Sequence, residues 1–108
     1  MKIDKTLQLP CGVEIKNRFL KSAMTEGIAN SDALSNNRHV KLYERWAKGG
    51  TGISITGNVQ IDHRYIERAG NVVIEGTQTN ESLAALANWS QAGKQNLSLI
   101  HISEPTRL

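Results

Sequence analysis

Residues 16–27 have the sequence KNRFLKSAMTEG, in which a short apolar run meets a cluster of small and hydroxyl side chains. The pattern predicts a strand around Arg18 to Ser22 that stops at a small-residue turn. Small side chains at the C-terminal end of a first strand let a planar cofactor lie against the backbone of a barrel enzyme. The segment therefore predicts a ligand-facing turn, provided that the rest of the chain forms such a barrel.

The residues before this segment predict a β-hairpin. Residues 7–15, LQLPCGVEI, alternate apolar and polar side chains on either side of a Pro-Cys-Gly turn. We expect this hairpin to close the bottom of a larger sheet. Cys11 has no histidine nearby in the sequence to activate it, so we expect an incidental exposed thiol. A single cysteine excludes an internal disulfide and suits a reducing compartment.

The residues after the segment predict a first β-loop-α unit. Residues 26–35 are polar and lack an apolar period, which indicates a loop. Ser35 or Asn36 can cap a helix that runs to about Lys48, where two glycines follow. The expected inner face of this helix consists of Val40, Tyr43 and Ala47.

A second unit follows directly. Residues 51–58, TGISITGN, form a β-branched run and predict the second strand. Residues 59–79 form a long polar loop, of a length that is usually functional when a scaffold holds it. We expect Asn80 to cap a helix from Glu81 to about Lys94. The expected inner face of this helix consists of Leu83, Leu86, Ala87 and Ser90.

Two consecutive β-loop-α units predict an α/β fold with parallel strands. With the hairpin in front, they describe the opening of a (β/α)8 barrel, cut short after its first two units. A doubly wound open sheet is the alternative. No Gly-x-Gly-x-x-Gly fingerprint follows the first strand, which disfavours that alternative.

The length and the amino-acid composition limit which classes of protein this chain can belong to. The 108 residues, 39% hydrophobic and 5% aromatic, fit one small domain or part of a larger one. The 13 Lys and Arg are scattered among 10 Asp and Glu, which disfavours nucleic-acid binding. The N-terminus has no apolar signal segment, and no run of about 18 apolar residues occurs. We therefore expect a cytoplasmic protein without a membrane span.

The end of the chain has a separate interpretation. Residues 97–102 have the pattern of a third strand, at the place where a barrel needs one. The run LSLIHISEPTR at 97–107 nevertheless resembles a translated sequencing-library adapter, and engineered segments are excluded from fold reasoning. We therefore predict a native part, residues 1–96, and a non-native tail, residues 97–108, and expect no catalytic role for His101.

Residues 7–96 resemble the N-terminal part of the Old Yellow Enzyme family, the FMN-dependent NADH:flavin oxidoreductases. The resemblance rests on motifs in family order and spacing: LPCG at 9–12 with KNR at 16–18, SAMT at 22–25, WAKGGTG at 46–52, ISITGNV at 53–59 and AGKQ at 92–95. It implies an FMN-binding (β/α)8 barrel preceded by a hairpin. It also implies hydride transfer from NADH or NADPH through FMN to an electron-poor alkene, such as a small α,β-unsaturated carbonyl compound.

The resemblance implies five cofactor-binding residues. Ser22, Ala23 and Met24 would supply backbone and small-side-chain contacts to the isoalloxazine. Thr25 would place its side chain near the flavin O4/N5 edge, where a hydrogen bond stabilises the charge of reduced flavin. Asn58 would border the pyrimidine side. The family's residues for substrate anchoring, proton donation and phosphate binding lie beyond the matched part, so we assign no catalytic residue.

The sequence departs from the family pattern near the substrate side of the site. Ala23 stands where proline is usual, and Gly57 stands where glutamate is common. Glu26 and Gly27 replace an aromatic residue that is often found shortly after Thr25. We expect Glu26 to be an exposed loop carboxylate with no partner that would shift its pKa.

Other polar and aromatic residues have simpler expected roles. We expect His39 to be a solvated residue of the first helix. Asp62, His63 and Glu67 imitate a metal cluster, but their ligand spacing is poor, and we assign no metal site. Trp46 and Trp89 are expected to pack between the helices and the barrel.

Two alternative functions stay open at this point. One is a small βαβα binding module without catalysis. The other is a truncated product without function, because two barrel strands with two helices leave open sheet edges and uncovered apolar faces. For the complete enzyme, the resemblance leaves room for a homo-oligomer, with no nucleic-acid or membrane partner.

Overall fold

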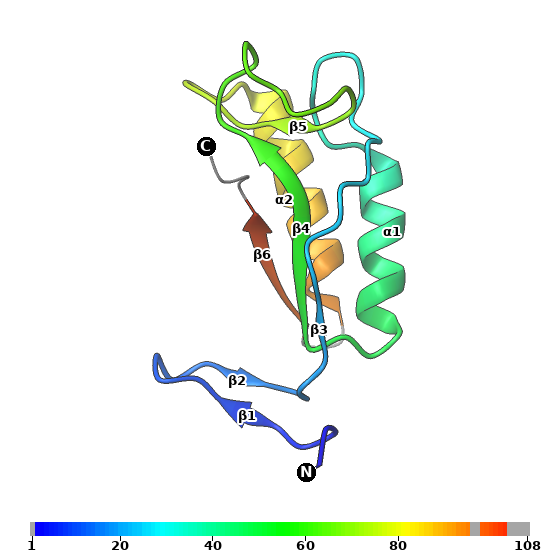
Figure 1. Ribbon diagram of the computed structural model, residues 1–108, viewed down its shortest axis with the longest axis vertical. Helices are drawn as coiled ribbons and strands as arrows, with labels where there is room; N and C mark the ends of the chain where they lie inside the picture. The colour runs from blue at the N-terminus through cyan, green and yellow to red at the C-terminus, as the bar shows by residue number, and fades with distance from the viewer. Residues whose placement is uncertain (1, 96–97, 104–108) are drawn as a thin grey trace.

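The computed structural model describes residues 2–95 and 98–103. The elements are, in chain order, β1 (Leu7–Gln8), β2 (Glu14–Ile15), β3 (Leu20–Lys21), α1 (Asn37–Lys48), β4 (Ile53–Gln60), β5 (Val72–Val73), α2 (Asn80–Gly93) and β6 (Leu99–Ser103). Figure 1 shows β4 at the centre, with the two helices side by side behind it and the β1–β2 hairpin below.

The main sheet is parallel and is built around β4. This strand pairs with β3 through Leu20 and Ile53, with β5 through Val59 and Val72, and with β6 through Ile53 and Leu99. Parallel neighbours need crossover connections, and α1 lies in the connection from β3 to β4. The predicted β-loop-α units are thus confirmed, and they form an open sheet rather than a closed barrel.

The core lies between the helices and one face of the sheet. Five buried apolar residues form it: Tyr43, Val59, Val72, Trp89 and Ala92. The ring of Trp89 packs edge-on against Tyr43, with 5.5 Å between centroids, and Trp46 does the same from the other side at 5.0 Å. Both tryptophans therefore pack where the sequence predicted.

The hairpin stands apart as a two-stranded antiparallel sheet. Gly12 has φ +93°, a conformation that glycine adopts without steric cost, and its N–H donates to the Leu9 carbonyl. Ile15 is buried, and the amide of Asn17 donates to the Gly50 carbonyl at 2.6 Å. Because Gly50 precedes β4, these contacts hold the hairpin near the start of that strand, as expected of a closing plug.

The helix starts follow from capping chemistry. Asn36 caps α1: its Oδ1 accepts from the Arg38 amide, and His39 Nδ1 accepts from the Asn36 amide, which completes a capping box. For α2 the predicted cap was wrong by one residue. Thr79 is extended and its hydroxyl accepts from the Ser82 amide at 3.1 Å, so Asn80 is the first helical residue.

The inner face of α2 also differs from the prediction. Leu83 and Ala87 are exposed, whereas Ser82, Trp89 and Ala92 are buried. The apolar residues of this helix are spread around its circumference. Leu86 packs against the core as predicted, whereas periodicity placed Leu83 and Ala87 there wrongly. The indole of Trp89 is the largest apolar group of α2, and its burial against α1 sets the rotation of the helix.

The strand boundaries shift by small amounts. β3 comprises only Leu20–Lys21 of the predicted 18–22, and β4 begins at Ile53 rather than residue 51. Gly50 has φ +108°, and Gly52 lies so close to Asn17 that a Cβ at 52 would be 2.6 Å from its Oδ1. These contacts keep residues 50–52 in the connection before the strand.

The fourth parallel strand of the sheet, β6, occupies Leu99–Ser103, within the region where the sequence pattern indicated a strand. The hydroxyl of Ser98 donates to the Thr51 carbonyl, and the side chain of Ile100 fills the space beside Gly93 of α2. The predicted boundary between a native part and a non-native tail falls at residues 96–97, which lie outside the described residues. So do residues 104–108 of the predicted tail. The adapter origin of the tail stays a prediction.

Neither helix of the described residues is both long and apolar enough to cross a bilayer.

Candidate functional site

The turn that was predicted to face a cofactor lies in an extended segment directly after β3. Ser22, Ala23 and Met24 are exposed, and Thr25 is half-buried. The Met24 carbonyl oxygen approaches Gly57 so closely that a Cβ at position 57 would collide with it. The turn is therefore accessible, and it lies against the C-terminal half of β4.

Asn58 lies in β4 near the same point and is half-buried. Its side chain hydrogen-bonds to the carboxylate of Glu67, which also accepts from the Asn71 amide at 3.3 Å and from Arg68 at 3.0 Å. These hydrogen bonds lower the pKa of the Glu67 carboxyl, and the bond from Asn71 has the largest effect. The structure thus brings Asn58 and the turn to the same end of the β3–β4 pair, with a loop carboxylate beside them.

Glu26 is not the exposed, unpartnered carboxylate that the sequence predicted. It is half-buried, and its Oε2 accepts from the Tyr43 hydroxyl and from the Gly57 amide, each at 3.1 Å. Burial raises the pKa of the Glu26 carboxyl, against the opposing effects of the Tyr43 hydrogen bond, the Lys21 charge and the Gly57 amide. Burial likewise raises the pKa of the Tyr43 phenol far above its usual range. The prediction failed because these partners are 17 and 31 residues away in the sequence.

Lys21 extends toward the helices. Its ammonium lies 4.4 Å from the ring centroid of Trp46 and 5.3 Å from that of Tyr43, and burial lowers its pKa. Within the described part of the chain its Nζ is buried without a hydrogen-bond partner. The Lys21 side chain therefore points to the helix side of the sheet. The neighbouring residue Leu20 points to the opposite face, where it is 52% exposed.

The open face of β3 and β4 combines groups that can stack against a planar ring with groups that can hydrogen-bond to its edge. It combines an accessible backbone and small side chains at 22–24, the hydroxyl of Thr25 and the amide of Asn58. These groups can contact a planar ring and hydrogen-bond to its carbonyl and nitrogen atoms. Because Lys21 faces the helices, its ammonium is directed away from this patch.

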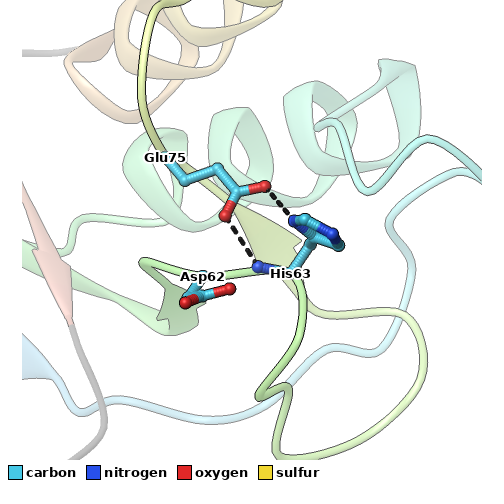
Figure 2. Close-up of side chains that lie close together, drawn as sticks. All are labelled: Asp62, His63 and Glu75. Carbon is cyan, nitrogen blue, oxygen red and sulfur yellow. Dashed lines mark hydrogen bonds and ion pairs between the residues drawn. The ribbon is translucent and has the colours of Figure 1, made fainter.

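A second polar cluster joins the loop after β4 to the segment after β5. Figure 2 shows Asp62, His63 and Glu75, whose ligand atoms all lie within 4.8 Å of one another. Glu75 accepts from the backbone amide of His63 at 2.8 Å, and its other oxygen lies 2.5 Å from His63 Nδ1. The structure thus pairs His63 with Glu75, whereas the sequence had grouped it with Glu67.

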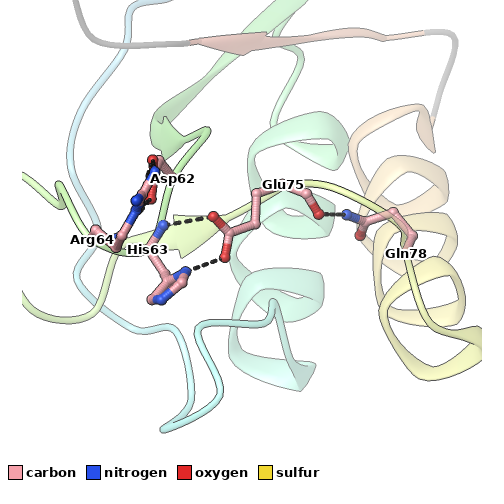
Figure 3. A network of polar contacts seen from close by, with 5 residues as sticks. All are labelled: Asp62, His63, Arg64, Glu75 and Gln78. Atoms are coloured by element: carbon pink, nitrogen blue, oxygen red, sulfur yellow. Dashed lines mark hydrogen bonds and ion pairs between the residues drawn. The ribbon is translucent and has the colours of Figure 1, made fainter.

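The same cluster continues into an ion pair and a loop contact. Arg64 bonds Asp62 with two nitrogens, at 2.7 and 3.0 Å, and this holds the pKa of the Asp62 carboxyl well below its usual range. Figure 3 shows these bonds together with that from the Gln78 amide to the Glu75 carbonyl. The carboxylates of Asp62 and Glu75 therefore already bond to protein groups. They connect two loops and are not free to act as metal ligands.

A cleft of about 330 Å³ adjoins this cluster, between the loop before α1 and the start of α2. Its lining includes Asp32, His63, Glu75, Thr79 and Glu81. None of the five predicted cofactor contacts lines it, so the cleft is separate from the open face of the sheet.

His39 is a further correction. The sequence predicted a solvated helix residue, but His39 is 1% exposed, and its ring packs 4.9 Å from the centroid of Trp89. Burial, with a smaller effect of Arg38, lowers the pKa of His39 to about 4. Its role is structural, because Nδ1 accepts the capping-box hydrogen bond of α1.

No family model matches the sequence. The chain is similar to the NADH-dependent flavin oxidoreductase iliE of Hypocrea jecorina (strain QM6a), with 34% identity over 104 residues, which cover 94% of this chain and 26% of the relative. It is also similar to the cinnamate reductase of Clostridium sporogenes, with 38% identity over 52 residues, 47% of this chain and 8% of the relative.

Among solved structures, the Old Yellow Enzyme from Pichia sp. AKU4542 has a TM-score of 0.79 and 18% identity, and the match covers 94% of this chain and 25% of that one. The structural neighbours are TIM-barrel proteins, which confirms the predicted fold class. The chain spans about a quarter of the length of iliE.

Proposed function

Because the chain is homologous to flavin oxidoreductases and has the fold of the Old Yellow Enzyme family over its described length, we propose that it forms one wall of the flavin site in an FMN-dependent NAD(P)H oxidoreductase. The observation that carries the proposal is the open end of the β3–β4 pair. There, an accessible turn of small residues lies beside Asn58.

In this proposal the chain holds and orients the ring. The backbone of Ser22, Ala23 and Met24 lies against the isoalloxazine, since no bulky side chain other than the flexible Met24 stands there. The Thr25 hydroxyl and the Asn58 amide hydrogen-bond to its polar edge. FMN, when bound, supplies the hydride-transfer chemistry that amino-acid side chains lack.

We propose an electron-poor alkene, such as an α,β-unsaturated carbonyl compound, as the substrate class. The name of the cinnamate reductase relative supports this class, because cinnamate is itself an α,β-unsaturated carboxylate. The reductant is NADH or NADPH. Other parts of a complete barrel would bind the phosphate, since in this fold that site is formed by the loops after strands 7 and 8.

The complete reading frame that contains this chain tests the proposal. The purified protein should be yellow and carry FMN, and NADH or NADPH should bleach its visible absorbance under anaerobic conditions. Cinnamate or a cyclic enone should then restore the colour. A colourless protein that takes up no added FMN would contradict the proposal.

A further inference from the structure

The side chains of β4 change faces part-way along the strand. Ser54 and Thr56 are fully buried under the helices, as a period of two requires. Val59 also belongs to the helix-side core, although it lies three residues after Thr56. Between Ile55 and Asn58 the register with β6 shifts, which marks a β-bulge.

The bulge decides where Asn58 points. In a regular strand, Asn58 would share the face of Thr56 and lie under the helices. With the extra residue at the bulge, it shares the half-buried face of Ile53 and Ile55. This is the open face, on the side of the sheet opposite the helices and next to the turn at 22–25.

Glu26 and Tyr43 hold the backbone at the bulge. The Gly57 amide lies 3.1 Å from Glu26 Oε2 and 3.2 Å from the Tyr43 hydroxyl, and that hydroxyl donates to Glu26. A bulge withdraws a backbone amide from the ladder, and a half-buried carboxylate is a strong acceptor for it. A Cβ at position 57 would collide with the backbone carbonyl oxygen of Met24 and would also lie 2.6 Å from Glu26 Oε2, so only glycine fits there.

We propose that Glu26 is a positioning residue, whose carboxylate holds the bulge at Gly57 and thereby turns Asn58 to the open face of the sheet. Glu26 directly follows the turn at 22–25, so the same residue couples that turn to the end of β4. This inference rests on the proposed function, because it assigns how the two flavin-facing segments are held in register.

Nuclear magnetic resonance of the full 108-residue chain tests the positioning step directly. The variants are Glu26→Ala, which removes the acceptor, Glu26→Gln, which keeps one, and Glu14→Ala as a control at an exposed glutamate. In Glu26→Ala, the Gly57 amide should exchange with solvent at least about tenfold faster. The hydrogen bond between the Asn58 side chain and Glu67 should weaken. Glu26→Gln and Glu14→Ala should retain both signals.

A second measurement covers the case in which Glu26→Ala does not fold. In the unmodified chain, the chemical shift of the Gly57 amide should follow the ionisation of Glu26, with a midpoint above the usual range of a glutamate. Tyr43 and Lys21 are the ionisable neighbours of Glu26, and the pKa of the Tyr43 phenol is raised far above its usual range. A Gly57 shift that stays constant through this titration, or an unchanged Asn58 contact pattern in a folded Glu26→Ala, would overturn the inference.

FMN binding by the complete reading frame separates this inference from the proposed function. Glu26→Ala and Asn58→Ala should each weaken FMN binding roughly tenfold, and the double variant should lose little more, because one acts through the other. If the unmodified protein takes up no FMN, the proposed function fails, while the exchange and contact data still decide whether Glu26 holds the bulge.

Discussion

Polar groups at the end of β3 and β4 differ sharply in what surrounds them. Ser22 and Met24 are exposed, Thr25 is half-buried, and Glu26 bonds to two groups of other elements. The residues that face solvent are those proposed to contact the flavin ring. The half-buried carboxylate of Glu26, which follows them, accepts from the backbone amide of Gly57, so neighbouring residues have separate roles.

Replacing Thr25 with valine should make the reduction potential of the bound flavin more negative. The change removes the proposed hydrogen bond to reduced flavin, and a charge-assisted bond corresponds to roughly 30–60 mV for a two-electron couple. Spectroscopic redox titration of the complete protein measures the shift, and Thr25→Ser, which keeps the hydroxyl, is the control. Equal flavin reduction potentials in Thr25→Val and the unmodified protein would contradict the proposed hydrogen bond from Thr25.

Buried His39 should make the protein less stable in acid. Its pKa is about 4 when folded and near 6.5 when unfolded, so the unfolded state takes up the proton first. Its contribution is complete above about pH 6.5, and roughly 2–3 kcal/mol is lost as the pH falls toward 4. Urea unfolding at a series of pH values measures this loss.

Two histidine variants control that experiment. His39→Gln keeps a side-chain acceptor for the capping box but cannot titrate, so its stability should depend less on pH. His63→Gln, at a histidine whose side chain is 69% exposed, controls for the loss of an imidazole outside the core. An identical pH profile for His39→Gln and the parent would show that His39 does not titrate as described.

At the scale of elements, caps and packing decide where the helices begin and which faces they bury. Asn36 starts α1 and Thr79 starts α2, each by accepting a backbone N–H that the helix itself cannot satisfy. The faces are then set by aromatic contacts, in which Trp89 of α2 meets Tyr43 and His39 of α1.

The cap of α2 can be tested by substitution. Thr79→Ala should lower the free energy of unfolding by about 0.5–2 kcal/mol, because the Ser82 amide loses its acceptor. Thr79→Ser should restore most of that stability. Thr77→Ala changes an exposed threonine in the same loop and should have little effect in the same urea titration. A loss of equal size at both threonines would speak against the cap.

At the scale of the whole molecule, the two faces of the sheet differ. The helices cover one face, while the other exposes Leu20 at 52%, with Phe19 and Met24 about half exposed nearby. Exposed apolar side chains beside unpaired strand edges favour association. In a complete barrel this face would be the interior, which would account for apolar residues sharing it with the residues proposed to contact the flavin ring.

Replacing Leu20 with lysine should therefore reduce self-association of the 108-residue chain. Sedimentation velocity at several concentrations measures the change, which should be several-fold in the concentration where oligomers appear. Leu83→Lys is a matched control, because Leu83 is also 52% exposed but lies on α2. Equal effects of the two variants would mean that net charge, and not the open face, governs association.

Much of the fold could be predicted from the sequence because it depends on interactions between neighbouring residues. The hairpin, the strand–helix alternation, the Asn36 cap and the glycines before β4 are local signals, and the structure confirms them. The small-residue turn at 22–25 was equally local. Its role in flavin binding stays a prediction.

The tertiary structure alone decided the groups whose partners are distant in the chain. Glu26 gained its partners from residues 43 and 57, His39 was buried by Trp89, and His63 paired with Glu75 rather than Glu67. No local pattern encodes such pairings, because burial and long-range hydrogen bonds arise only when the elements pack. The sequence determined which segments form strands and helices. Packing determined which of their polar side chains face the open side of the sheet and which hold the backbone behind it.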